Sequence, residues 1–172
     1  MPKPFSENVV FFDTEFSTLD PYQGEILSVG MVKFSGEELY VELEHDGVVS
    51  DWVKTNVLSG MTGEKVSREA ARAKIQQFLG DSQPYLVGYV TSFDSIYFYK
   101  LFGTETSPAY WIPIDFASIL FGLGIDPESY YRKDKKNFFK RIGIDTSNYH
   151  EHNALDDAKL LREVYLKMSA KR

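Results

Sequence analysis

The first apolar run of the chain, residues 9–12, ends in two acids, Asp13 and Glu15. Valine and phenylalanine crowded in this way are typical of a buried β-strand. Because side chains alternate along a strand, both carboxylates are expected on the same face. Two like charges on a core strand lose hydration and repel each other, at a cost of several kcal/mol each. The pair therefore predicts a site for divalent cations, completed by acids from elsewhere in the chain.

The order of the predicted elements indicates the fold class. Three strand-like segments open the chain, at 8–16, 25–34 and 38–44, and the short turn-rich breaks between them favour an antiparallel meander. Two more strands are predicted at 85–90 and 111–114. Helices are predicted at 51–58, 68–79, 93–102, 116–120, 127–142 and 153–168. This order predicts an α/β fold with a mixed β-sheet flanked by helices, in one domain covering 1–172.

Composition excludes several classes of protein. No stretch approaches the roughly 20 apolar residues of a membrane span. The chain has no cysteine, which excludes disulfides and cysteine-based zinc sites, and its start has no secretory apolar region, so a cytoplasmic location is expected. A net charge of −6 counts against a protein that coats nucleic acid non-specifically. An enzyme acting on phosphodiesters remains open, because metal ions would neutralise its acidic centre.

Residues 152–157 form a second candidate segment. The buried stripe of the helix predicted over 153–168 comprises Ala154, Ala158, Leu161, Tyr165 and Met168. Asp157 falls near this stripe and faces the sheet, whereas Asp156 falls on the solvated face. Asp157 could equally be a first-turn acid that satisfies helix N–H groups. His152, in the preceding loop, has the chemistry to deprotonate a water near neutral pH, although a lone loop histidine is more often a surface residue.

Asp94 is the best candidate for a fourth acid. It lies at the start of the helix that follows the predicted strand at 85–90, where a favourable first-turn charge is the alternative interpretation. Asp115 competes for this role, but its position before Phe116 makes it a good helix N-cap, so we interpret it as structural.

These residues together carry a family resemblance. The segments Asp13-Thr14-Glu15, Ser92-Phe93-Asp94 and 152–157 resemble, in order and spacing, the three motifs of the DEDDh group of DnaQ-like 3′→5′ exonucleases. Residues 12–16 and 52–58 are similar to the RNase AS exoribonucleases. One departure is that many relatives have an asparagine a few residues before the middle acid, where this chain has 88–92 (Gly-Tyr-Val-Thr-Ser).

The resemblance implies a ribonuclease H-like fold and removal of nucleotides from 3′ ends with two Mg²⁺ or Mn²⁺ ions. By this resemblance Asp13, Glu15, Asp94 and Asp157 bind the metals and His152 is the general base. Oxygen ligands without cysteine suit these ions. The resemblance also implies a homodimer, and single-stranded RNA as the substrate.

Substrate contacts are predicted on both sides of the acids. Thr14 lies between two of them, and Phe16 follows directly, where relatives have an apolar side chain against the terminal base. A basic segment precedes His152 and includes Arg132, Lys135 and Lys136. It is interpreted either as a phosphate-binding patch or as the solvated face of an amphipathic helix with Phe138 and Phe139 inward.

Other functions fit the same pattern. A DNA exonuclease or proofreading module would use the same four acids. A catalytically silent nucleic-acid-binding relative is a further alternative, but such a relative is expected to lose a metal acid, and this chain retains all four.

Overall fold

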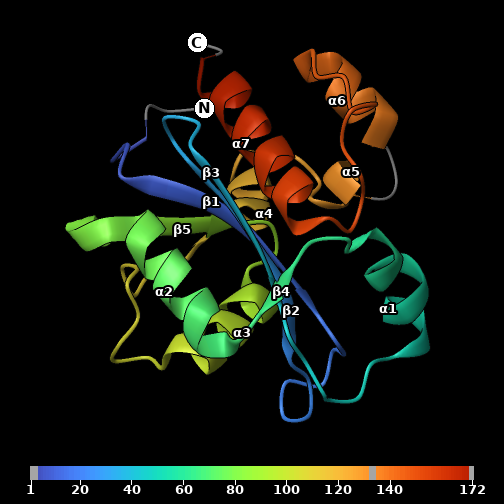
Figure 1. Cartoon of the computed structure of the whole chain (residues 1–172). Helices are drawn as coiled ribbons and strands as arrows, with labels where there is room; N and C mark the ends of the chain where they lie inside the picture. Colours follow the sequence, from blue (N-terminus) through green and yellow to red (C-terminus); the bar gives the residue numbers. More distant parts are fainter. Residues whose placement is uncertain (1–3, 132–134, 171–172) are drawn as a thin grey trace.

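A computed structural model of the chain describes residues 4–131 and 135–170, and within them a mixed six-stranded sheet has the order β4-β3-β2-β1-β5-β6 (Figure 1). The strands are β1 (Val9–Phe16), β2 (Ile26–Lys33), β3 (Glu38–Leu43), β4 (Lys65–Val66), β5 (Tyr85–Gly88) and β6 (Ile114–Asp115). The α-helices are α1 (Asp51–Asn56), α2 (Arg68–Leu79), α3 (Ser92–Phe102), α4 (Phe116–Gly122), α5 (Glu128–Tyr131), α6 (Lys135–Ile142) and α7 (Ala154–Ala170). Two 3₁₀ turns are η1 (Leu58–Gly60) and η2 (Gly80–Ser82).

The sheet confirms the predicted α/β class. β1, β2 and β3 form an antiparallel meander, and β5 joins β1 in parallel. β6 extends the parallel part beyond β5, and β4 pairs in parallel with β3 at the opposite edge. The carboxyl ends of β1 and β5 therefore lie at one edge of the sheet, where open α/β sheets usually carry their sites.

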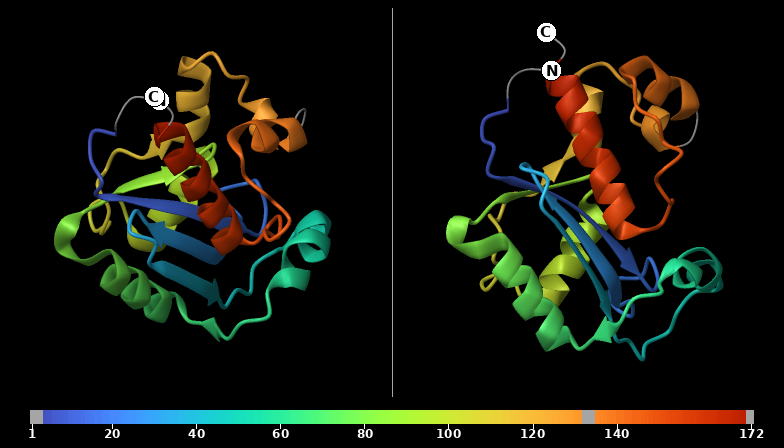
Figure 2. Two further views of the ribbon diagram at one scale, coloured as in Figure 1. Left: turned by 90° about the horizontal axis from the view of Figure 1, so that it is seen from above. Right: turned by 45° about the horizontal axis from the view of Figure 1, so that its top comes forward.

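Helices cover both faces of the sheet (Figure 2). Alternate residues of β1 pack into two separate cores. Val10 and Phe12 pack with α2 and α3 on one face. Val9 and Phe11 pack with α4, α5, α6 and α7 on the other. Asp13 and Glu15 continue the series of Phe11, so they point toward the face that α7 covers.

The last helix crosses the sheet with its N-terminal turn over β1 and β2 (Figure 2). The five residues predicted to form its apolar stripe are all buried. The Arg162 guanidinium donates hydrogen bonds to the carbonyl oxygens of Lys33 and Phe34, which fixes the middle of the helix to the end of β2. α7 is therefore held to the sheet by apolar packing and by polar contacts.

The prediction of one helix over 127–142 is wrong. The ring centroids of Tyr130 on α5 and Phe139 on α6 are 5.3 Å apart. In one continuous helix, nine residues would rise by about 13 Å, which would hold these rings apart. The two short helices instead pack against each other. The inward orientation of Phe138 and Phe139 is confirmed, since both are buried.

Two short strands also differ from the prediction. The strand expected at 111–114 is limited to Ile114–Asp115, because Pro113 has no N–H to donate to a ladder. β4 was not predicted, since two residues are too few to show alternation. In the part of the chain that the structure describes, no helix is both long and apolar enough to cross a membrane.

Candidate active site

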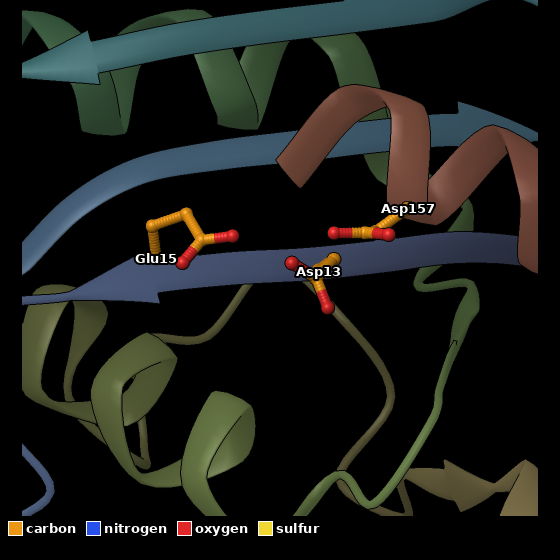
Figure 3. A group of neighbouring side chains, drawn as sticks. All are labelled: Asp13, Glu15 and Asp157. Carbon is orange, nitrogen blue, oxygen red and sulfur yellow. The ribbon is translucent and has the colours of Figure 1, made fainter. Parts of the chain in front are cut away.

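Three carboxylates meet at the carboxyl end of β1. Asp13 and Glu15 project from the strand, and Asp157 reaches down from the first turn of α7 (Figure 3). One carboxylate oxygen from each lies within 4.8 Å of the others. The Asp157 carboxylate is oriented by the loop before its helix, because the backbone N–H of His152 donates to Asp157 Oδ2 at 3.1 Å. Residues 144 positions apart in the sequence thus form one cluster.

Asp94 lies beside this cluster and is held by β1. Its Oδ1 accepts hydrogen bonds from the Thr14 backbone N–H at 3.0 Å and from Thr14 Oγ1 at 2.7 Å. The Asp94 side chain is buried and lines the same pocket as the other three acids. It is not within the group whose oxygens lie inside 4.8 Å. The first turn of α3 therefore supplies a fourth carboxyl group at the edge of the cluster.

The pKa values of all four acids are raised above their ordinary values. Burial raises the pKa of Asp13 well above its ordinary value, and the charges of Asp94, Asp157 and Glu15 raise it further. Burial, then the charges of Asp157 and Asp94, raises the pKa of Glu15 to about 8. Burial likewise raises the pKa of Asp157 to about 7, and that of Asp94 to about 6 despite the hydrogen bonds from Thr14 that lower it.

A cluster of this kind fits divalent cations. Mg²⁺ and Mn²⁺ prefer carboxylate oxygens, and positive charge would favour the ionised form of all four groups. Asp13, Glu15 and Asp157 have the spacing to share one ion, whereas Asp94 lies outside that group.

His152 lies at the mouth of the cluster in a constrained backbone conformation. Its φ is +61°, in the left-handed region that few non-glycine residues adopt. Its ring is 4.8 Å from the Trp52 ring and 6.5 Å from the Tyr131 ring, measured between centroids. Burial lowers the pKa of His152, although the charge of Glu151 opposes the shift. The imidazole is therefore neutral at pH 7 and able to accept a proton.

These groups line one pocket of about 520 Å³. Its apolar wall includes four residues with substantial exposure that were not predicted as site residues, namely Leu19, Trp52, Val90 and Tyr131. Trp52 could have been identified as a site candidate from the sequence, because it places a large aromatic ring on the otherwise polar side of a short helix. The pocket thus combines an acidic floor with apolar walls.

Known structures share this architecture. Over 95% of this chain, a zinc-bound complex of E. coli exonuclease I with single-stranded DNA superimposes with a TM-score of 0.71 at 16% sequence identity. A complex of the same enzyme with a dT13 oligonucleotide gives a TM-score of 0.72 at 16% identity. The chain has the fold of the part of exonuclease I that it matches. It spans 41% of the exonuclease I chain in both structures. No protein-family model and no curated protein matches the sequence.

Within this exonuclease fold, two predicted substrate contacts next to the acids already have partners. Thr14 borders the pocket, but its hydroxyl donates to Asp94. The Phe16 ring stacks on Tyr97, with centroids 4.5 Å apart and planes inclined by 10°, and on Phe93 at 5.8 Å. Contact with substrate stays a prediction for both residues.

The basic segment contributes to the pocket region through Lys135. Lys135 Nζ pairs with Glu151, the neighbour of His152, and lies 5.8 Å from the centroid of the Tyr131 ring. Lys136 is exposed on α6. Arg132, the third predicted contact in this segment, lies outside the described residues.

Asp115 has the capping position expected of it and a second role. Its Oδ2 accepts from the Ser118 backbone N–H at 3.0 Å, which caps α4. Its Oδ1 accepts from the Val90 backbone N–H at 2.8 Å. Val90 has a φ of +57°, which is unfavourable for a β-branched residue. Asp115 thus holds a strained turn at the rim of the pocket.

Proposed function

We propose that the protein is a metal-dependent 3′→5′ exoribonuclease of the DEDDh type that removes nucleotides from single-stranded RNA. The observation that carries the proposal is the convergence of Asp13, Glu15 and Asp157 within 4.8 Å, with Asp94 beside them. These acids are costly to keep together without bound cations, so selection for stability alone does not explain them. The exonuclease I fold supports a nuclease.

In the proposed enzyme the four acids hold two Mg²⁺ or Mn²⁺ ions. When bound, such ions stabilise the charge on the attacking and departing oxygens of an in-line displacement. By the resemblance to DEDDh exonucleases, Asp13 would be a ligand of both ions, Glu15 and Asp157 would complete one site, and Asp94 would support the other. The hydrogen bonds from Thr14 orient Asp94 for this role.

His152 is the proposed general base. Its lowered pKa keeps the imidazole unprotonated at neutral pH, so it can take a proton from the attacking water. Contacts with Trp52 and Tyr131 restrict the movement of its ring. Its backbone N–H meanwhile holds Asp157 in place.

The apolar walls of the pocket suit unpaired bases. Base stacking on an aromatic ring contributes about 1–3 kcal/mol and tolerates any base. Trp52 exposes 54% of its surface at the wall and is the most accessible aromatic ring of the pocket. Phe16 is the proposed contact for the terminal base, and Lys135, Lys136 and Arg132 are proposed phosphate contacts.

RNA is proposed as the substrate on the resemblance to RNase AS. Single-stranded DNA is the second candidate, because the solved neighbours of the same fold include exonuclease I bound to a dT13 oligonucleotide. We further propose a homodimer on the same resemblance. The order of the elements along the sequence supports the proposal of one exonuclease domain over 1–172, and the lack of cysteine supports the proposal of a cytoplasmic location.

The test measures how matched RNA and DNA oligonucleotides shorten from their 3′ ends when the protein is incubated with Mg²⁺, Mn²⁺ or EDTA. We expect RNA to shorten in single-nucleotide steps with either metal and to remain intact with EDTA. Asp13→Asn and Asp157→Asn should abolish the ladder in proteins that remain folded, while the adjacent Asp156→Asn retains it. Ladders that persist in Asp13→Asn would reject the proposal, and a ladder on DNA alone would favour the second candidate.

A further inference from the structure

Gly30 lies directly beneath the first turn of α7. A Cβ atom on Gly30 would be 2.2 Å from the carbonyl carbon and oxygen of Ala154 and 2.3 Å from the Leu155 nitrogen. These distances are more than 1 Å shorter than the 3.4 Å at which ordinary van der Waals contact begins. The obstacle is helix backbone, which cannot rotate aside as a side chain would. Any residue other than glycine must therefore displace the start of α7 from the sheet.

Gly30 leaves a gap in the layer of side chains on the face of the sheet that α7 covers. Gly30 pairs with Asp13 on β1 and with Tyr40 on β3. Directly opposed residues of neighbouring strands point to the same face, so side chains flank Gly30 on both sides and none rises between them. The first turn of α7 occupies this gap, where Ala154 is fully buried.

The distance between the first turn of α7 and the sheet controls the position of Asp157. Asp157 follows Ala154 by three residues in the same helical turn, and its backbone N–H donates to the Asn153 carbonyl oxygen at 2.9 Å. A shift of the helix start therefore moves Asp157 by nearly the same distance. Asp13, the cross-strand partner of Gly30, stays with the sheet. Any outward shift of α7 thus separates Asp157 from Asp13 and Glu15.

We propose that Gly30 is a positioning residue that sets the distance between Asp157 and the Asp13–Glu15 pair, and so the metal affinity of the site. The inference rests on the proposed metal-dependent function. Mg²⁺ requires near-ideal geometry, with ligands at about 2.0–2.1 Å, so a displacement of 1 Å in one ligand is large. Gly30 itself contacts no metal and no substrate.

The first test measures Mn²⁺ binding to the metal-free protein, residues 1–172, by calorimetry. We expect Gly30→Ala to remain folded by circular dichroism and to bind Mn²⁺ about 10- to 100-fold more weakly. Val29→Ala is the matched control, because Val29 is the buried neighbour on the opposite face of β2. It should lower the melting temperature and leave Mn²⁺ affinity unchanged. If Gly30→Ala does not fold, Ala154→Ser enlarges the fully buried side chain of the same helical turn, and it should also weaken Mn²⁺ binding by displacing that turn.

The second test is a rescue that a merely structural role would not produce. Asp157→Glu lengthens the side chain by one methylene, which should weaken Mn²⁺ binding in the otherwise unmodified protein. In the Gly30→Ala background the longer side chain compensates for the displaced helix, so affinity should increase. Unchanged Mn²⁺ affinity in Gly30→Ala, or losses that simply add in the double variant, would overturn the inference. Failure of the unmodified protein to bind Mn²⁺ would reject the proposed function as well.

Discussion

Single residues at the pocket have unfavourable backbone conformations, and Val90 is the clearest example. A β-branched residue at a φ of +57° costs about 1–3 kcal/mol, whereas asparagine tolerates this region. Val90→Asn keeps the backbone N–H that donates to Asp115. We expect it to stabilise the protein by about 1 kcal/mol in urea melts. The exposed Val48, which has no positive φ, provides the control, and an equal gain in Val48→Asn would contradict the explanation.

The proposed base is tested by separating turnover from metal binding. We expect His152→Ala to lower kcat by about 100- to 10,000-fold, because a general base is removed, and to change Mn²⁺ affinity little. The backbone N–H that holds Asp157 is present in both proteins. His150→Ala is the control, since the side chain of His150 is exposed and contacts Asp156. A collapse of Mn²⁺ binding in His152→Ala would show that the imidazole is needed for structure.

At this scale the sequence predicted the acids better than their surroundings. Spacing and helix periodicity were enough to select Asp157 over Asp156, because only one of two adjacent helical residues can face the sheet. Alternation along a strand likewise predicts that Asp13 and Glu15 share a face. The contact of the Trp52 ring with His152 and the hydrogen bond from Thr14 to Asp94 join distant segments, which no local pattern records.

Among the elements, α4 depends on a cap that serves two segments. Asp115 accepts hydrogen bonds from Ser118 at the start of α4 and from Val90 in the strained turn. We expect Asp115→Ala to lower the free energy of unfolding by about 1–3 kcal/mol, since both groups lose their acceptor. Denaturant titration measures the change. Asp46→Ala, at an exposed position, should alter stability by less than about 0.5 kcal/mol, and an equal loss there would argue against the cap.

Elements with long periodic patterns were predictable, and short ones were not. The meander, α2 and α7 follow from alternation, caps and apolar stripes. Tyr130 on α5 and Phe139 on α6 both fill the same core, and a sequence window cannot detect such a contact between two short helices.

In the whole molecule, the acid cluster makes the stability of the metal-free protein depend on pH. The pKa values of Asp94, Asp157 and Glu15, at about 6, 7 and 8, exceed their ordinary values of 3.8, 3.8 and 4.5. The folded state therefore binds protons more tightly than the unfolded state. The resulting stabilisation is complete below about pH 4 and is lost as the pH rises through about 8.

We therefore expect the melting temperature of EDTA-treated protein to fall by several degrees between about pH 5 and pH 8.5. Saturating Mn²⁺ should remove most of this decline, because bound cations favour the ionised acids. Asp13→Asn should also flatten the curve, since it removes one of the interacting charges. A melting temperature that rises over this range without metal would contradict the expected shifts.

The distance along the chain between Asp13 and Asp157 has a consequence during synthesis. A growing polypeptide exposes its first strand long before the ribosome has made the final helix. Under the proposed function, such an unfinished chain has no complete catalytic centre and cannot degrade the message that encodes it. Activity begins only once translation has passed residue 157 and the last helix has docked.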